Sequence, residues 1–134
     1  MITIETNRIP CRDDLLELYG DAGWTAYTDH PDRLERGLAR SLAVYTAWEG
    51  DTLAGLLRAV GDGETILYLQ DLLVRKAFQR RGIGGALLRR MVEDFPQVRQ
   101  KVLLTDAADR RALDLYRACG WRGAEELGCT ALLG

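Results

Sequence analysis

The sequence predicts an α/β sandwich whose central sheet is mostly antiparallel, formed as one domain over residues 1–134. Strand-like segments at 42–48, 52–60 and 65–74 follow one another directly, with only short turns rich in glycine and aspartate between them. Turns this short join antiparallel neighbours, so the segments are expected to form a meander. Segments with apolar residues three or four positions apart come before and after the meander and predict helices there.

The other elements are assigned in chain order from local patterns. Alternating apolar and polar residues predict a strand at 2–6, and Pro31 predicts the start of a helix. Pro96 and Gly120 mark the ends of two later helices. The aromatic segment 24–29 shows no period and is expected as a loop. The remaining elements are helices at 13–19, 31–40, 82–95 and 109–119, a strand at 101–105, and one or two strands in 121–134.

Composition and charge exclude several classes of protein. Apolar residues make up 47% of the chain and charged residues 28%, which are ordinary values for a globular domain. No apolar run approaches the roughly 18 residues of a membrane helix, and the first residues lack the features of a secretory signal. A net charge of −2 offers no bulk attraction to nucleic acid or anionic lipid. The odd number of cysteines, three, fits reduced thiols, so we expect a cytoplasmic protein without metal, nucleic-acid or membrane partners.

Glycines and basic residues gather where the 65–74 strand gives way to the 82–95 helix. The unpaired amides at a helix N-terminus bind phosphate oxygens, and glycines there let an anion approach the backbone, so this segment predicts an anion site. It is not a dinucleotide fingerprint, whose third glycine would fall at Leu87, and it lacks the Gly-Lys-Ser/Thr of a nucleotide-binding P-loop. No acidic residue lies between positions 75 and 90, where the basic residues are Arg75, Lys76, Arg80, Arg81, Arg89 and Arg90.

Two segments carry a resemblance to a known superfamily. The run Gln79-Arg80-Arg81-Gly82-Ile83-Gly84 matches the Gln/Arg-x-x-Gly-x-Gly/Ala signature of GNAT N-acetyltransferases. Residues 109–121 resemble the downstream Asn-x-x-Ala-x-x-x-Tyr-x-x-x-Gly-Phe pattern of the same superfamily. The resemblance implies a three-layer sandwich with a central mixed, mostly antiparallel sheet flanked by about four helices. It also implies transfer of an acetyl group from acetyl-CoA to a primary amine of a small molecule, such as an arylalkylamine or a polyamine.

The resemblance further implies where acetyl-CoA binds. The backbone of the 72–74 segment is expected to hydrogen-bond the pantetheine arm as an added strand, with the Val74 amide at the thioester carbonyl. A bulge would splay this strand from the 101–105 strand and open a slot. Asp109 stands where the superfamily has an asparagine that contacts the pantetheine, and a carboxylate accepts hydrogen bonds but donates none. The implied cofactor-binding residues are Leu72, Leu73, Val74, Gln79, Arg80, Arg81, Gly82, Ile83, Gly84, Gly85 and Asp109.

Two residues are candidates for the chemistry itself. The resemblance makes Tyr116 the general acid that protonates the departing thiolate; the alternative is a buried tyrosine bonded to a backbone carbonyl. Asp71 is the nearest candidate for the base that deprotonates the amine, because the 101–105 strand carries leucines where some members have a glutamate. The alternative for Asp71 is a structural carboxylate, with a water chain taking the proton. Trp24 and Tyr27 either line the acceptor pocket or simply pack.

Two hypotheses for the function follow. The first is an acetyl-CoA-dependent N-acetyltransferase that works by direct attack of the amine in a ternary complex. The second is a non-catalytic acyl-CoA-binding or sensing domain, which the missing strand carboxylate and the aspartate at position 109 would favour. An edge strand near the C-terminus could pair with a second copy, so a homodimer is a further expectation.

Overall fold

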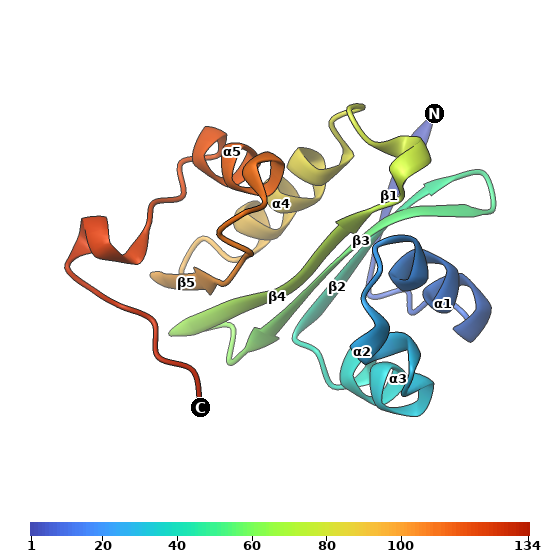
Figure 1. Cartoon of the computed structure of the whole chain (residues 1–134), viewed down its shortest axis with the longest axis horizontal. Helices are drawn as coiled ribbons and strands as arrows, with labels where there is room; N and C mark the ends of the chain where they lie inside the picture. The colour runs from blue at the N-terminus through green and yellow to red at the C-terminus, as the bar shows by residue number, and fades with distance from the viewer. The chain divides into compact units, whose positions relative to one another are not determined.

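A five-stranded sheet forms the centre of the larger of two compact units into which the chain divides (Figure 1). The computed structural model describes residues 1–134, with the first unit at Met1–Leu104 and the second at Thr105–Gly134. The strands of the sheet lie side by side in chain order, and all pairs are antiparallel except β4–β5, which is parallel. Their bounds are β1 Ile2–Thr6, β2 Ala43–Glu49, β3 Thr52–Gly61, β4 Ile66–Val74 and β5 Gln100–Leu103.

Helices cover both faces of this sheet (Figure 1). In β3, Leu56 joins the core beneath α1 and α3, whereas a Cβ added to Gly55 would lie 3.3 Å from the Cγ2 of Ile83 in α4. Adjacent strand residues point to opposite faces, so α4 lies on the face away from α1 and α3. The predicted three-layer sandwich with a mixed, mostly antiparallel sheet is confirmed. The helices of this unit are α1 Arg12–Asp21, α2 Thr25–Thr28, α3 Pro31–Ala39 and α4 Ile83–Asp94, with a 3₁₀ turn η1 at Lys76–Phe78.

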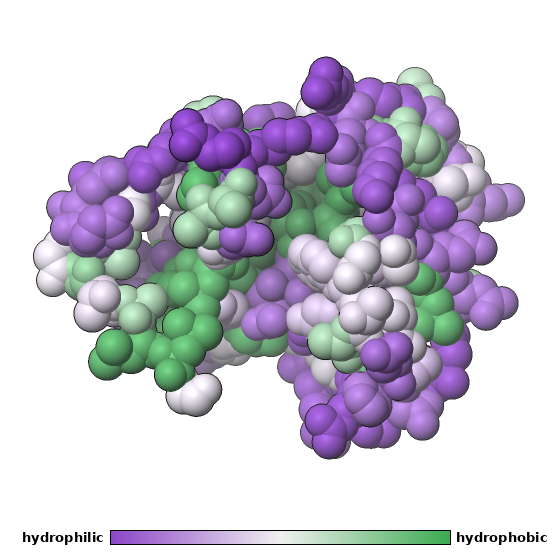
Figure 2. All heavy atoms as spheres, viewed as in Figure 1, coloured by the Kyte–Doolittle hydropathy of each residue, from purple (hydrophilic) through white to green (hydrophobic).

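The layer of α1 and α3 buries an apolar stripe and turns polar residues outward. α1 contributes Leu15 and Leu18, and α3 contributes Leu34 and Leu38, pairs that are three and four positions apart and share one helix face. Figure 2 shows mostly hydrophilic and neutral residues on the outward surface of this layer. None of the helices of the protein has the length and apolar character needed to cross a bilayer.

The second unit contains α5, Arg110–Ala118, and a 3₁₀ helix η2, Ala124–Leu127. The expectation of one or two strands in 121–134 is wrong, because this segment forms no strand. Its backbone groups bond locally instead: the amide of Gly128 donates to the carbonyl of Glu125 at 3.2 Å, and that of Cys129 to Ala124 at 2.9 Å. A strand would have to give these groups to a neighbouring strand, so the turn competes with it.

The expectation of a loop at 24–29 is also wrong, because α2 forms a single helical turn there. The amide of Asp29 donates to the carbonyl of Thr25 at 2.8 Å, and the amide of Tyr27 to that of Trp24 at 3.1 Å. A helix of four residues is too short to show a hydrophobic period in the sequence. The turn contains Tyr27 and directly follows Trp24, the two aromatic residues that the sequence suggested for the acceptor pocket.

The turn between β3 and β4 is organised by the carboxylate of Asp62. One of its oxygens, Oδ1, accepts the amides of Glu64, Thr65 and Ile66 at 2.9, 2.7 and 3.0 Å, and Oδ2 accepts the Thr65 hydroxyl at 2.6 Å. The hydrogen bond from the Thr65 side chain, followed by those from the amides, holds the pKa of Asp62 well below its usual range. The charged form of this side chain therefore stabilises the turn.

We expect Asp62→Asn to lower the melting temperature by a few degrees at pH 7, because the amide keeps the shape but not the charge. In the unfolded chain Asp62 has a pKa of about 3.9. Since the folded pKa is lower, the stabilisation is complete above about pH 5 and is lost as the pH falls below about 4. Thermal denaturation of both proteins from pH 7 to pH 2 measures this. A difference at pH 2 as large as that at pH 7 would contradict the assignment.

Candidate functional site

A bulge interrupts the pairing of β4 with β3. Arg58 of β3 lies opposite Asp71, but the next residue, Ala59, lies opposite Leu69, so Gln70 is an extra residue on β4. Arg58 and Ala59 point to opposite faces of the sheet, and their partners Asp71 and Leu69 therefore do so as well. Both partners are buried. The bulge thus lets a carboxylate enter the interior from a strand whose other buried residues, Leu67, Leu69 and Leu73, are apolar.

Beyond the bulge, one edge of β4 has no strand beside it. The pairing of β4 with β5 ends at Leu69, so the rest of the strand bonds only to β3. The Arg75 amide donates to a β3 carbonyl at 2.8 Å, and the direction of the amides alternates along a strand. The amides of Val74 and Leu72 therefore point to the open edge. An extended ligand can bond this edge as an added strand.

The N-terminus of α4 leaves several amides without a helical partner. Gly82 precedes the helix with a φ of +78°, which glycine adopts without strain. The first hydrogen bond inside the helix runs from the Ala86 amide to the Gly82 carbonyl at 3.0 Å. The amides of Ile83, Gly84 and Gly85 consequently have no acceptor within the helix. Together with the positive end of the helix dipole, they suit the oxygens of a phosphate group.

The residues of the loop before α4 differ in how their side chains and backbone are held. The Gln79 side chain donates to the carbonyl of Val74 at 3.3 Å and so ties the loop to the end of β4. Arg80 has a φ of +65°, an unusual conformation for a residue other than glycine. The Arg81 guanidinium bonds the Glu49 carboxylate at 2.9 Å. Arg81 can therefore offer a ligand its backbone amide while its side chain stays paired.

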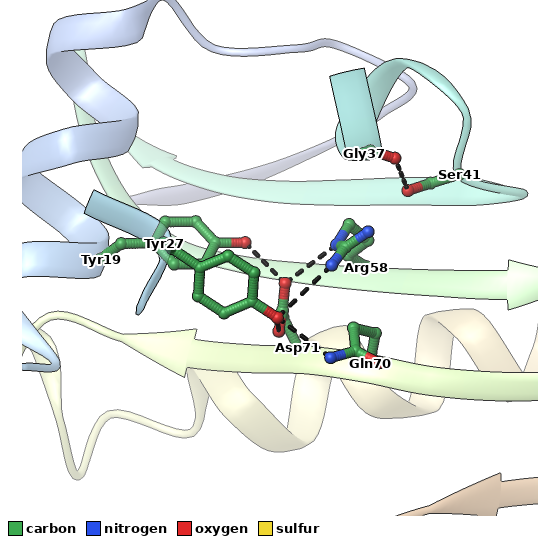
Figure 3. A network of polar contacts seen from close by, with 7 residues as sticks. All are labelled: Tyr19, Tyr27, Gly37, Ser41, Arg58, Gln70 and Asp71. Carbon is green, nitrogen blue, oxygen red and sulfur yellow. Dashed lines mark hydrogen bonds and ion pairs between the residues drawn. The ribbon is translucent and has the colours of Figure 1, made fainter. Parts of the chain in front are cut away.

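A buried polar network lies beside the bulge (Figure 3). The Asp71 carboxylate accepts the hydroxyls of Tyr19 and Tyr27 at 2.9 and 2.8 Å and the Nε of Arg58 at 2.9 Å. The Gln70 side chain donates to the Tyr27 hydroxyl at 3.0 Å. The side chain of Asp71 is only 1% exposed and that of Arg58 10%, so the ion pair is shielded from water. Burial, and then the charge of Asp71, raises the pKa of Tyr19, which keeps its hydroxyl a donor.

Two further predicted site residues, the pantetheine contact Asp109 and the general acid Tyr116, lie in the second unit. Asp109 caps α5, and its Oδ1 accepts the Ala112 amide at 3.1 Å. Burial, and then the Asp109 carboxylate, raises the pKa of Tyr116 to about 12, so its hydroxyl holds a proton at neutral pH. The Tyr116 ring lies 6.2 Å from that of Trp121 between centroids. The helix turn thus presents a protonated phenol.

The structure joins some of the residues that the sequence suggested separately. Asp71 and Tyr27 are in direct contact, and the ring centroids of Tyr27 and Trp24 lie 6.1 Å apart. Sequence reasoning missed Arg58 and Tyr19, which complete the network. Arg58 is the one charged residue inside the apolar 52–60 strand, and a buried partner is the usual reason for such a charge. No group of three or more His, Cys, Asp or Glu side chains is arranged to hold a metal ion.

Solved structures share this fold over 91–100% of the chain. A GNAT family acetyltransferase, SP0256 from Streptococcus pneumoniae TIGR4, is 34% identical, with a TM-score of 0.88 over 100% of this chain and 97% of that chain. A Bacillus subtilis acetyltransferase in complex with CoA is 24% identical, with a TM-score of 0.72 over 91% of this chain and 77% of that chain. The second likeness concerns the fold alone.

Sequence comparisons agree with the fold. The uncharacterized N-acetyltransferase YvbK of Bacillus subtilis (strain 168) is 29% identical over 91 residues, or 66% of this chain. The match spans 56% of the length of that relative. The model of the acetyltransferase (GNAT) family matches residues 11–121, which include the β4 bulge, the N-terminus of α4 and α5. This chain belongs to the GNAT acetyltransferase family.

Proposed function

We propose that this protein is an acetyl-CoA-dependent N-acetyltransferase that acts on a primary amine of a small molecule. The observation that carries the proposal is the open edge of β4 beyond the bulge, followed in the chain by the N-terminus of α4 with its unpartnered amides. The pantetheine arm can bond the edge at 72–74 while the diphosphate of coenzyme A meets the amides of 81–85, with Arg80 beside them. Membership of the GNAT family supports this ligand.

The proposed reaction is a direct transfer in a ternary complex. The neutral amine nitrogen attacks the thioester carbon and forms a C–N bond, while the Val74 amide donates a hydrogen bond to the carbonyl oxygen as it becomes negative. The C–S bond then breaks, and Tyr116 donates a proton to the departing sulfur. The nitrogen releases one proton to water and Tyr116 regains one. The products are the N-acetylated amine and the free thiol of coenzyme A.

Gln79 and Asp109 have supporting roles in this proposal. Gln79 bonds the Val74 carbonyl and so helps to hold the edge that meets the thioester. One oxygen of Asp109 caps α5, and the carboxylate has further lone pairs that can accept an amide N–H of the pantetheine. The asparagine of the family pattern could also donate there. We therefore assign Asp109 only an acceptor role.

A non-catalytic acyl-CoA sensor is the second candidate function, and one observation favours it. The carboxylate nearest to the thioester edge, that of Asp71, is paired with Arg58 at 2.9 Å. The sequence Val102-Leu103-Leu104, at the end of β5 and just after it, offers no alternative base. A primary ammonium group has a pKa near 10.4, so transfer at neutral pH needs a route for its proton. In a sensor no such route is required.

Thiol release distinguishes the two functions. The protein is incubated with acetyl-CoA and, in turn, phenethylamine, spermidine, free amino acids and short peptides, and the free thiol is measured. Binding of CoA and acetyl-CoA is measured in parallel by calorimetry. Thiol release above the amine-free rate with any of these amines supports the transferase. Binding without such release across the panel supports the sensor, and absence of heat with both CoA and acetyl-CoA refutes both.

A further inference from the structure

The contacts of Asp71 leave it poorly suited to take a proton. Its Oδ2 accepts both Tyr19 and Arg58, and its Oδ1 accepts Tyr27, so both oxygens are already occupied (Figure 3). Protonating the carboxylate would leave the Arg58 guanidinium buried without a counter-charge. An ion pair whose carboxylate is bonded on both oxygens instead fixes the positions of the groups around it. The groups held in this way belong to α2, α3 and the bulge of β4.

Tyr27 is the point at which the network leaves the core. Its hydroxyl donates to Asp71 and accepts the Gln70 side chain at 3.0 Å and the Nη2 of Arg58 at 3.5 Å. Tyr27 belongs to α2, a single turn without a fully buried residue, whereas Gln70 and Asp71 form the bulge of β4. The short helix is thus joined to both residues of the bulge through one hydroxyl group. Packing of Tyr27 and Trp24 against the core also holds this helix, and the Tyr27 hydroxyl adds its polar link to the bulge.

α3 packs against the Arg58 side of the network. A Cβ added to Gly37 would lie 3.2 Å from the Nη1 of Arg58, so the helix backbone approaches the guanidinium closely. The backbone at Gly37 is itself held by the Ser41 hydroxyl, which donates to the Gly37 carbonyl at 2.8 Å (Figure 3). Arg58 therefore has little room to move away from Asp71. The pair is anchored by β3, β4 and α3 together.

We infer that Arg58 and Asp71 are positioning residues. Their buried ion pair couples α2 and the neighbouring Trp24 to the bulge of β4. The aromatic side chains that face the acceptor amine and the strand edge that holds the thioester therefore keep a fixed spacing. This inference rests on the proposed function, which assigns the aromatic side chains to the acceptor amine and the strand edge to the thioester. The coupling itself is a property of the first unit. In this arrangement Asp71 sets where Tyr27 stands and does not receive the proton of the amine.

Hydrogen exchange tests the coupling without any reaction. Tyr27→Phe removes only the hydroxyl, and we expect amide exchange to become about three- to tenfold faster in 24–28 and in 70–74 together. Tyr45→Phe is the matched control, because it removes the hydroxyl of another buried tyrosine, which bonds the Asp94 carboxylate at 2.9 Å outside the network. The control should leave both segments unchanged. Faster exchange confined to 24–28, or the same change in both variants, would overturn the coupling.

Kinetics then distinguish a positioning residue from a base. Using phenethylamine or spermidine, whichever the wild type acetylates faster, we expect Tyr27→Phe and Asp71→Asn each to raise the KM for the amine about tenfold. The affinity for CoA and the acidic limb of the pH profile of kcat/KM should be the same as in the wild type. If Asp71→Asn removes that limb with an unchanged KM, Asp71 is the base and the inference is wrong. If Asp71→Asn does not fold, Tyr27→Phe decides through its KM and its hydrogen exchange.

The outcomes also separate this inference from the proposed function. If the wild-type protein binds CoA but acetylates no amine of the panel, the proposed transferase function is refuted, and the exchange experiment still tests the coupling. If the enzyme is active but its Tyr27→Phe variant shows unchanged exchange in 70–74, the proposed function stands and the coupling is refuted.

Discussion

Replacement of Tyr116 by phenylalanine should lower kcat about 100-fold while the Kd of acetyl-CoA stays within about twofold of wild type. The hydroxyl is assigned to the departing sulfur, which becomes negative only as the C–S bond breaks, so its loss affects the transition state more than the bound substrate. A phenol with a pKa of about 12 is a weak acid, and this places the expected effect at the lower end of the range for general acids. Stopped thiol-release assays at saturating substrates measure kcat, and calorimetry measures Kd.

The high pKa of Tyr116 also predicts a pH profile. The proton stays on the hydroxyl up to a pKa of about 12, so Tyr116 should cause no fall in wild-type turnover between pH 7 and 10. Tyr45→Phe, which loses a hydroxyl in the first unit, should keep wild-type turnover across this range. Equal turnover of Tyr116→Phe and wild type would remove Tyr116 from the mechanism.

Replacement of Gly82 by glutamate should weaken CoA binding at least 100-fold, or by about 2.8 kcal/mol. A Cβ at Gly82 meets no atom within 4 Å, so the side chain fits the folded protein and projects into open space. Its carboxylate would stand at the amides of Ile83, Gly84 and Gly85, where the proposed diphosphate binds. Repulsion and competition for the same donors both oppose the ligand. Calorimetric titration with CoA measures the loss.

Gly23→Glu is the matched control for this substitution. Gly23 has a φ of +77°, almost the same as the +78° of Gly82, and a Cβ there also meets no atom within 4 Å. Both variants therefore carry the same added charge and the same strain of a non-glycine residue in the left-handed region, about 1–2 kcal/mol. Their melting temperatures should fall alike, but only Gly82→Glu should lose CoA. Undiminished affinity in Gly82→Glu would refute the assigned phosphate site.

The elements around the phosphate site could be predicted from the sequence because their signals are local. The glycines at 82, 84 and 85 follow an apolar strand at a fixed spacing, and Pro31 marks a helix start that the structure confirms. The structure places a bulge in the strand where the family resemblance implied one. A β-bulge, however, depends on how two strands pair, and a single strand sequence does not show which residue is extra.

The buried network could not be predicted, because its members are far apart in the chain. Tyr19 and Asp71 are separated by 52 positions, and Tyr27 and Asp71 by 44. Each residue alone has an ordinary explanation as a core or surface side chain. Only the charge of Arg58 within an apolar strand pointed to a buried partner, and it did not say which carboxylate.

The open edge of β4 has a consequence for handling the protein. A row of backbone donors and acceptors without partners is a template on which other chains can add in β form, and this is a common start of aggregation. The same stretch is the proposed seat of the pantetheine arm, so a bound cosubstrate would cover it. Preparations kept saturated with coenzyme A should therefore stay clear on storage at concentrations at which the empty protein turns cloudy.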